Sequence, residues 1–135
     1  MFEISVKSHF SSAHRLKRYE GACHNLHGHN WEVEVFLRGA QTNHIGMLVD
    51  FRKIKIAVRD VLKKLDHCEL NRLPAFARTN PTSENLAKYI FHILSDIFRR
   101  ESFTVNRVWV SESPGTSACY REDVATDGKD GVVKN

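Results

Sequence analysis

Apolar and polar residues alternate with a period of two over residues 2–14 and again over residues 27–38. Successive side chains of a β-strand point to opposite faces, so this alternation predicts two strands that each bury one face. The apolar positions are Phe2, Ile4 and Val6 in the first stretch and Trp31, Val33, Val35 and Leu37 in the second. Residues 104–112 and 117–122 predict two more strands near the end of the chain.

Between these strands lie two stretches whose apolar residues recur at intervals of three and four, the spacing of one helix face. The first predicted helix covers residues 51–65 and follows Asp50, a favourable N-cap residue. The second begins at Thr82 or Ser83 and extends to about residue 100. The inward positions are Ile54, Val58, Val61, Leu62 and Leu65 in the first helix and Leu86, Tyr89, Ile90, Ile93, Leu94 and Ile97 in the second.

The order of these elements, ββααββ, predicts an α+β fold in which a four-stranded antiparallel sheet carries two helices on one face. The 135 residues suffice for one domain and are too few for two of ordinary size. We expect this domain over residues 1–122. Residues 123–135 contain little apolar content, which predicts a polar C-terminal tail.

The composition, 41% hydrophobic and 27% charged, is that of a soluble globular protein. No apolar stretch approaches the roughly 20 residues that span a bilayer, so we expect no membrane partner. The first residues alternate like a strand and lack the layout of a signal peptide. Three cysteines at wide spacing do not form a disulfide framework. These features predict a cytoplasmic protein.

The net charge of +4 is mildly basic and favours an anionic ligand only weakly. No basic helix and no aromatic-interleaved basic stripe occurs, so we expect no nucleic-acid partner. The densest basic run, residues 15–18, fits a solvated surface better than a phosphate site.

Three histidines form a candidate metal site. His27 and His29 are one residue apart at the start of a predicted strand, so their imidazoles point to the same face. His14 ends the preceding strand and joins them if the two strands are hairpin neighbours. Three histidines are the usual protein ligands of a catalytic zinc, which keeps a fourth position open. The alternative is a set of surface or hydrogen-bonded core histidines.

Cys23 lies in a loop-like stretch immediately before the histidine pair. Beside bound zinc its thiol loses its proton more readily, which suits a base or a metal ligand. The alternative is a buried, inert thiol. Cys68 and Cys119 have no such neighbours, and we expect both to be structural.

Other candidate side chains lie farther along the chain. Asp66 and His67 follow the first helix, where a carboxylate–imidazole pair can move protons or simply complement the helix end. Glu112 ends an apolar strand, and its carboxylate can clamp an amidine-like edge of a ligand with two parallel hydrogen bonds. Its alternative role is a solvated strand terminus. Thr82 and Ser83 read as a helix start.

The combination of these motifs resembles the 6-pyruvoyltetrahydropterin synthase family over residues 2–122. The similarity is carried by His14, residues 23–30 (CHNLHGHN), residues 65–67 (LDH), residues 81–85 (PTSEN) and residues 110–112 (VSE). The three-residue gap between Cys23 and His27 is similar to the bacterial 6-carboxytetrahydropterin synthase branch, which acts in queuosine (7-deazaguanine) biosynthesis. Members that make biopterin usually have a longer gap.

The resemblance implies a tunnelling fold (T-fold), in which the sheets of a trimer join into a barrel and trimers stack in pairs as hexamers. It implies 7,8-dihydroneopterin triphosphate as substrate, a pocket between subunits, and 6-carboxy-5,6,7,8-tetrahydropterin, acetaldehyde and triphosphate as products. The roles it implies are zinc binding by His14, His27 and His29, a general base at Cys23, a proton-transfer pair at Asp66 and His67, pterin anchoring by Glu112 and pocket contacts by Thr82 and Ser83.

Three other functions remain open at this point. A 6-pyruvoyltetrahydropterin synthase eliminates triphosphate from the same substrate. A zinc-stabilised binding module, for example one that binds RNA, performs no turnover. A catalytically silent homologue only binds pterins.

Overall fold

The computed structural model describes residues 1–18, 21 and 24–123. Its strands are β1 (Phe2–His14), β2 (His27–Gly39), β3 (Thr104–Ser113) and β4 (Thr116–Tyr120), and its α-helices are α1 (Phe51–Lys63) and α2 (Ser83–Ile97). Short 3₁₀ turns, η2 (Leu70–Arg72) and η3 (Pro74–Phe76), lie between the helices. The predicted ββααββ order and the antiparallel four-stranded sheet, in the order β1-β2-β3-β4, are confirmed.

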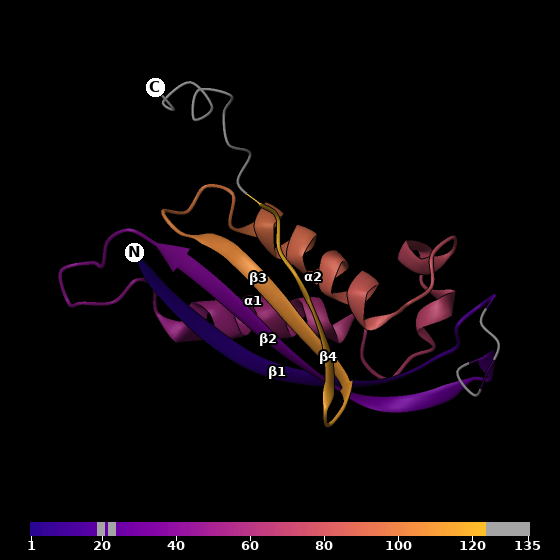
Figure 1. Ribbon diagram of the computed structural model, residues 1–135. Coiled ribbons are helices and arrows are strands. Elements are labelled where there is room, and N and C mark those ends of the chain that lie inside the picture. Colours follow the sequence, from indigo (N-terminus) through magenta and orange to yellow (C-terminus); the bar gives the residue numbers. More distant parts are fainter. Residues whose placement is uncertain (19–20, 22–23, 124–135) are drawn as a thin grey trace, which may run out of the picture.

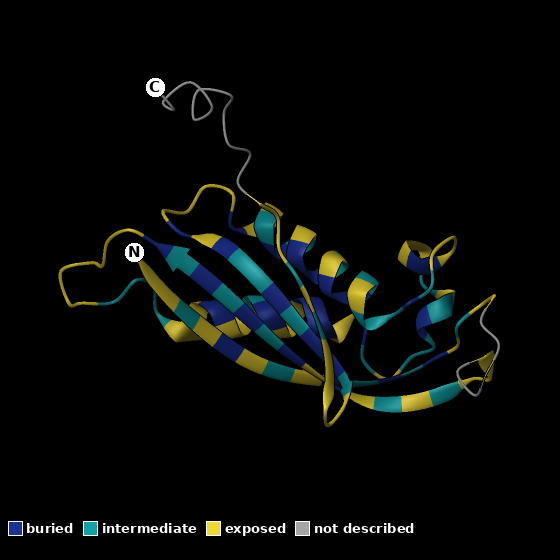
Figure 2. Ribbon diagram, in the orientation of Figure 1, coloured by how far each residue is buried: buried dark blue, intermediate teal, exposed yellow. Residues whose placement is uncertain are grey.

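Both helices cover the same face of the sheet (Figure 1). The stripes of buried residues in Figure 2 follow the alternation of each strand. The apolar face predicted for β2 is confirmed, because Trp31, Val33, Val35 and Leu37 are all buried. The Trp31 ring stacks on Phe10 of β1, with ring centroids 5.7 Å apart. This stack closes the core at the end of the sheet where the histidines lie.

Local capping fixes where each helix begins. The Asp50 side chain accepts a hydrogen bond from the Arg52 backbone N–H, as the sequence predicts. The hydroxyl of Thr82 accepts one from the Asn85 backbone N–H at 3.1 Å. In each case a side-chain oxygen satisfies a backbone donor that has no partner within the first helical turn.

The sequence prediction was wrong at two core positions. Ile97 is 50% exposed, and Phe98, just beyond α2, is buried in its place. Phe2 is 51% exposed because it lies at the end of an edge strand, beyond the region that the helices cover. Helix α1 also ends at Lys63 and α2 at Ile97, earlier than the predicted residues 65 and 100. The apolar period alone does not show where a helix leaves the core.

Replacing Thr82 by alanine tests the cap of α2. We expect the free energy of unfolding to fall by about 1 kcal/mol, the typical cost of losing a threonine cap. Thr82→Ser keeps an oxygen at the same place and is the matched control. Urea denaturation followed by circular dichroism measures both variants, and an alanine variant as stable as the serine variant would contradict the capping role.

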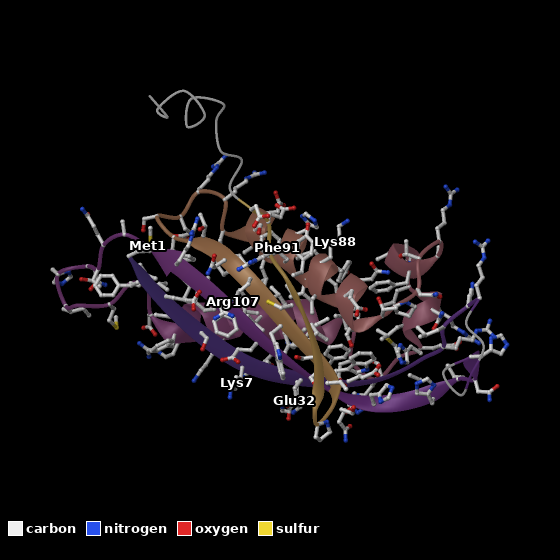
Figure 3. The ribbon with its side chains drawn as sticks, viewed as in Figure 1. Met1, Lys7, Glu32, Lys88, Phe91 and Arg107 are labelled. Atoms are coloured by element: carbon white, nitrogen blue, oxygen red, sulfur yellow. The ribbon has the colours of Figure 1, made fainter. Side chains whose placement is uncertain are left out.

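The sheet face away from the helices carries many charged residues. Lys7, Glu32 and Arg107 lie on it (Figure 3). The Arg107 guanidinium lies 3.9 Å from the centroid of the Phe36 ring and 3.1 Å from the Glu3 carboxylate. None of the helices in the described part of the chain is long and apolar enough to cross a membrane.

Candidate metal centre

The register of the first two strands brings the three histidines together. His14 is directly opposite His27, and Ser12 is opposite His29. Residues directly opposite one another in antiparallel strands project to the same face, and His27 and His29 share a face because they are two residues apart. One nitrogen from each imidazole lies within 4.8 Å of the other two. The hairpin that the three-histidine prediction requires is therefore present.

Hydrogen bonds to the backbone hold two of these imidazoles by their Nδ1 atoms. His14 Nδ1 lies 2.7 Å from the Pro81 carbonyl oxygen, and His27 Nδ1 lies 2.7 Å from the Asn25 carbonyl oxygen. A carbonyl only accepts hydrogen bonds, so each Nδ1 carries the proton and each Nε2 keeps its lone pair. This is the arrangement in which histidine binds a metal while a backbone acceptor fixes its ring.

The remaining nitrogen atoms fit a metal ion. His14 Nε2 and His29 Nε2 are buried and have no hydrogen-bond partner within the described part of the chain. Buried polar atoms without a partner are costly, and here two of them face the same point. A divalent cation that accepts both lone pairs, together with that of His27, removes this cost. The donor set of three imidazole nitrogens suits zinc.

Burial keeps these imidazoles in the form that binds metal. The pKa of His14 is lowered mainly because the side chain is withdrawn from water. The pKa of His29 is lowered for the same reason, although the nearby Glu112 carboxylate acts in the opposite direction. A lowered pKa means that both rings stay neutral at neutral pH, as ligation requires.

Trp31 forms the wall behind the cluster. Its ring meets those of His14 and His29 edge to face, with centroids 4.9 and 5.2 Å away. Its indole N–H donates a hydrogen bond to the Ser12 carbonyl oxygen at 3.2 Å. The sequence predicted Trp31 as a core residue, and the structure adds its contact with the candidate ligands.

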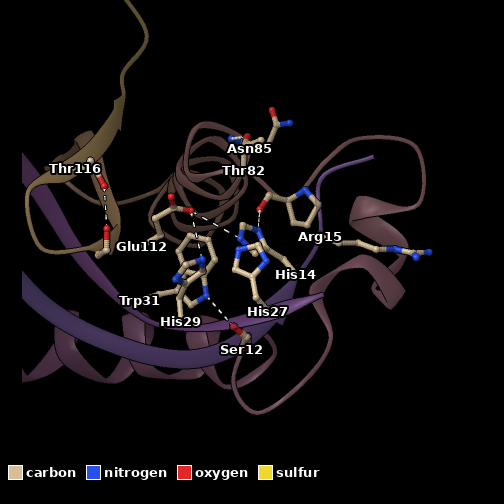
Figure 4. A network of polar contacts seen from close by, with 12 residues as sticks. Ser12, His14, Arg15, His27, His29, Trp31, Thr82, Asn85, Glu112 and Thr116 are labelled. Atoms are coloured by element: carbon tan, nitrogen blue, oxygen red, sulfur yellow. Dashed lines mark hydrogen bonds and ion pairs between the residues drawn. The ribbon is translucent and has the colours of Figure 1, made fainter. Parts of the chain in front are cut away.

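Glu112 comes to the histidines from β3 (Figure 4). One of its carboxylate oxygens lies 3.8 Å from His14 Nε2 and 3.7 Å from His29 Nε2. Glu112 faces this way because it shares the face of Val108 and Val110, which are buried under the helices. The pairing of β2 with β3 then carries its side chain to the histidine end of the sheet.

A small cavity of about 180 Å³ opens beside this cluster. It is lined by His14, Leu16, Thr82, Ser83, Glu84, Glu112, Thr116 and Ser117. The structure thus brings predicted pocket residues from the start of α2 and the end of β3 to one place. Thr116 and Ser117 were missed, because no motif marks them. Gly115, at φ 94°, reverses the chain before them, and the nearby Ser111 hydroxyl lies 2.6 Å from the Thr116 carbonyl oxygen.

Asp66 and His67 lie elsewhere, along the outer edge of β1. An Asp66 carboxylate oxygen accepts a hydrogen bond from the Ser11 backbone N–H at 2.9 Å, and the other lies 2.8 Å from His67 Nδ1. The Ser11 hydrogen bond, and then the one with His67, hold the pKa of Asp66 below its usual value. His67 is exposed, and neither residue lines the cavity beside the histidines.

The three cysteines lie in different parts of the chain. Cys23, the predicted general base, lies outside the residues that the structure describes. Cys68 is half-buried, and its thiol lies 3.4 Å from the Leu65 carbonyl oxygen, which fits the predicted structural role. Cys119 is exposed on β4, which does not fit the structural role predicted for it, because an exposed thiol contributes little to packing.

A family model described as 6-pyruvoyl tetrahydropterin synthase matches residues 3–123 of the chain. A putative 6-carboxy-5,6,7,8-tetrahydropterin synthase from Archaeoglobus fulgidus is 36% identical over 110 residues, which cover 82% of this chain and 87% of the relative. The 6-pyruvoyl tetrahydrobiopterin synthase of Drosophila melanogaster is 32% identical over 139 residues, which cover 93% and 82%. These relatives carry the names of two different synthases, so similarity alone does not choose between them.

The solved structure of Caenorhabditis elegans 6-pyruvoyl tetrahydropterin synthase matches the fold with a TM-score of 0.81. The two chains are 31% identical, and the match covers 90% of this chain and 96% of the other. The predicted tunnelling fold of the single chain is therefore confirmed.

Proposed function

The chain belongs to the 6-pyruvoyl tetrahydropterin synthase family. We propose that it converts 7,8-dihydroneopterin triphosphate and one water molecule to 6-carboxy-5,6,7,8-tetrahydropterin, acetaldehyde and triphosphate. The observation that carries a lyase role is the cluster of three histidines, with two buried unpartnered nitrogens, beside the cavity that Glu112 lines. The choice of branch rests on the three-residue gap between Cys23 and His27. The enzyme would then act in queuosine (7-deazaguanine) biosynthesis.

His14, His27 and His29 would hold the zinc ion and leave its fourth position to the substrate. When bound, zinc supplies Lewis acidity at the side-chain oxygens of the substrate, which makes the neighbouring carbon-bound protons easier to remove. Trp31 and the Pro81 carbonyl keep the His14 ring in place while substrate binds.

The protein side chains would bind the pterin and move protons. Glu112 accepts two parallel hydrogen bonds from the amidine-like edge of the pterin ring, and Thr82 and Ser83 line the same cavity. Cys23 removes a proton from the substrate side chain, and the pair Asp66 and His67 returns one elsewhere. No redox cofactor is required for this sequence of steps.

The position of Asp66 and His67 supports a site at a junction between subunits. Both lie beside β1, which is an edge strand of the sheet, and outside the cavity of their own chain. Strand β4 is the other edge, and unpaired edges are the surfaces through which sheets of separate chains join. We propose a homo-oligomer, a hexamer made from two trimers, in which this pair serves a neighbouring site.

Product analysis tests the proposed function. Zinc-loaded protein incubated with 7,8-dihydroneopterin triphosphate is expected to release acetaldehyde and 6-carboxy-5,6,7,8-tetrahydropterin, as measured by liquid chromatography with mass spectrometry. A 6-pyruvoyl product without acetaldehyde would assign the chain to the other branch, that of the 6-pyruvoyl synthases such as the Drosophila relative. Stoichiometric zinc with neither turnover of the substrate nor binding of pterins would favour a zinc-stabilised binding module.

Glu112→Gln tests the pterin anchor. We expect KM to rise by about 10- to 100-fold, because one charge-assisted interaction with the ring is replaced by a weaker neutral one. The zinc content should stay unchanged, because Glu112 is not one of the proposed ligands. Glu32→Gln, on the sheet face away from the helices, is the control. An unchanged KM with normal zinc content would remove Glu112 from the pterin site.

A further inference from the structure

A second cavity lies close to the metal centre and is basic. Its volume is about 420 Å³, and it is lined by Lys17, Arg18, Phe76, Ala77, Arg78, Thr79 and Asn80. Three of these residues are cationic, and none of the described residues that line it is acidic. Phe76 is buried and closes one side, and Thr79 adds a hydroxyl group.

The three cations have no carboxylate partner within the described part of the chain. None of its ion pairs involves Lys17, Arg18 or Arg78. Other arginines are paired, for example Arg72 with Glu69 and Arg99 with Asp96. Three like charges around one cavity repel one another, and an anion in that cavity relieves the repulsion.

The backbone of Arg18 supports a binding role. Its φ is 65°, in the left-handed region that residues with a Cβ rarely adopt. Residues held in this region cluster at ligand sites, where the surrounding structure maintains them. The preceding residue, Lys17, is fixed by the Asn80 side chain, which accepts from the Lys17 N–H at 2.8 Å and donates to its carbonyl oxygen at 2.9 Å.

The chain segments that contain Asn80 and Lys17 place the cavity next to the metal centre. Asn80 precedes Pro81, whose carbonyl oxygen accepts the hydrogen bond from His14. Lys17 follows His14 by three residues, which span at most about 11 Å of extended chain. Two segments therefore connect the cavity to the histidine cluster: the one that contains Asn80 and Pro81, and the one from His14 to Lys17. Arg15, in the same basic run, instead extends away from the histidines (Figure 4).

We propose that this basic cavity, made by Lys17, Arg18 and Arg78, binds the phosphate chain of the substrate. The inference rests on the proposed function, since it takes a pterin whose side chain carries a triphosphate. One end of such a substrate lies at Glu112, the side-chain oxygens lie at the histidines, and the phosphates reach the cations. The sequence alone predicts that residues 15–18 form solvated surface, and only the fold brings two of them to Arg78.

The test measures the binding of two pterins to zinc-loaded protein by calorimetry, neopterin triphosphate and neopterin. We expect the wild-type protein to bind neopterin triphosphate at least about tenfold more tightly than neopterin. Arg78→Ala should weaken the affinity for neopterin triphosphate by about tenfold and change the affinity for neopterin by less than about twofold. Arg18→Gly, which removes a cation and also relieves the backbone strain, is expected to act in the same way. High salt should reduce the advantage of the triphosphate in the wild type.

Arg99→Ala is the matched control, because Arg99 lies beyond the other end of α2 and should change neither affinity. A wild-type protein with equal affinity for the two pterins would overturn the inference, and so would two cavity variants that keep the full preference for the triphosphate. Neither measurement depends on the product. A chain that forms 6-pyruvoyl product can still show the phosphate site, and one that forms 6-carboxy product can fail to show it.

Discussion

Replacing His14 by alanine is expected to weaken zinc binding by more than about 100-fold and to abolish turnover. Loss of a partner that only orients a metal ligand already costs about 10- to 100-fold in affinity, and loss of a ligand costs more. His14 is the most buried of the three histidines, with 1% of its surface exposed, and water does not readily replace it there. Zinc content after dialysis, measured by mass spectrometry, and acetaldehyde release report the two effects.

Two further variants make this result interpretable. His44→Ala removes an exposed histidine between β2 and α1 and should keep both zinc and activity. His29→Ala removes a less buried ligand and should lose zinc even if the His14 variant folds poorly. A folded His29 variant with stoichiometric zinc would show that these histidines do not form the metal site, and the proposed lyase chemistry would lose its basis.

Replacing Cys23 by alanine is expected to lower kcat by about 10²- to 10⁴-fold, the usual contribution of a positioned acid or base. Zinc should remain bound, because the three histidines supply the proposed ligands without it. The prediction rests on the place of Cys23 in the sequence, four residues before His27. Single-turnover assays with 7,8-dihydroneopterin triphosphate separate this loss from slow product release.

Cys119→Ala is the matched control, since this thiol is exposed on β4 and should be dispensable. A Cys23 variant that loses zinc as well as activity would make Cys23 a metal ligand, the alternative that the sequence leaves open. A variant with unchanged turnover would assign the proton removal to another residue. If neither the variant nor the wild type turns the substrate over but both bind neopterin, the chain is a silent homologue that only binds pterins.

Local rules were sufficient for most of the fold. The alternation in β2 placed Trp31 and Val33 in the core, and the caps at Asp50 and Thr82 were correct because each involves residues only two or three positions apart. Ile97 was wrongly placed in the core because its spacing matches the buried face of α2, whereas the last residue of the helix extends beyond the core. Periodicity describes one element and carries no information on where its neighbour ends.

In the candidate site, too, some features follow from the local sequence and others only from the tertiary structure. The shared face of His27 and His29 follows from strand geometry alone. The sequence by itself determined these two candidate ligands, the candidate base Cys23 and the family motifs. Only the tertiary structure decided that His14 stands opposite His27, that Glu112 reaches the same cluster from β3, and that Asp66 lies at the edge of β1. Strand register and helix packing set these distances, and both depend on contacts between residues far apart in the chain.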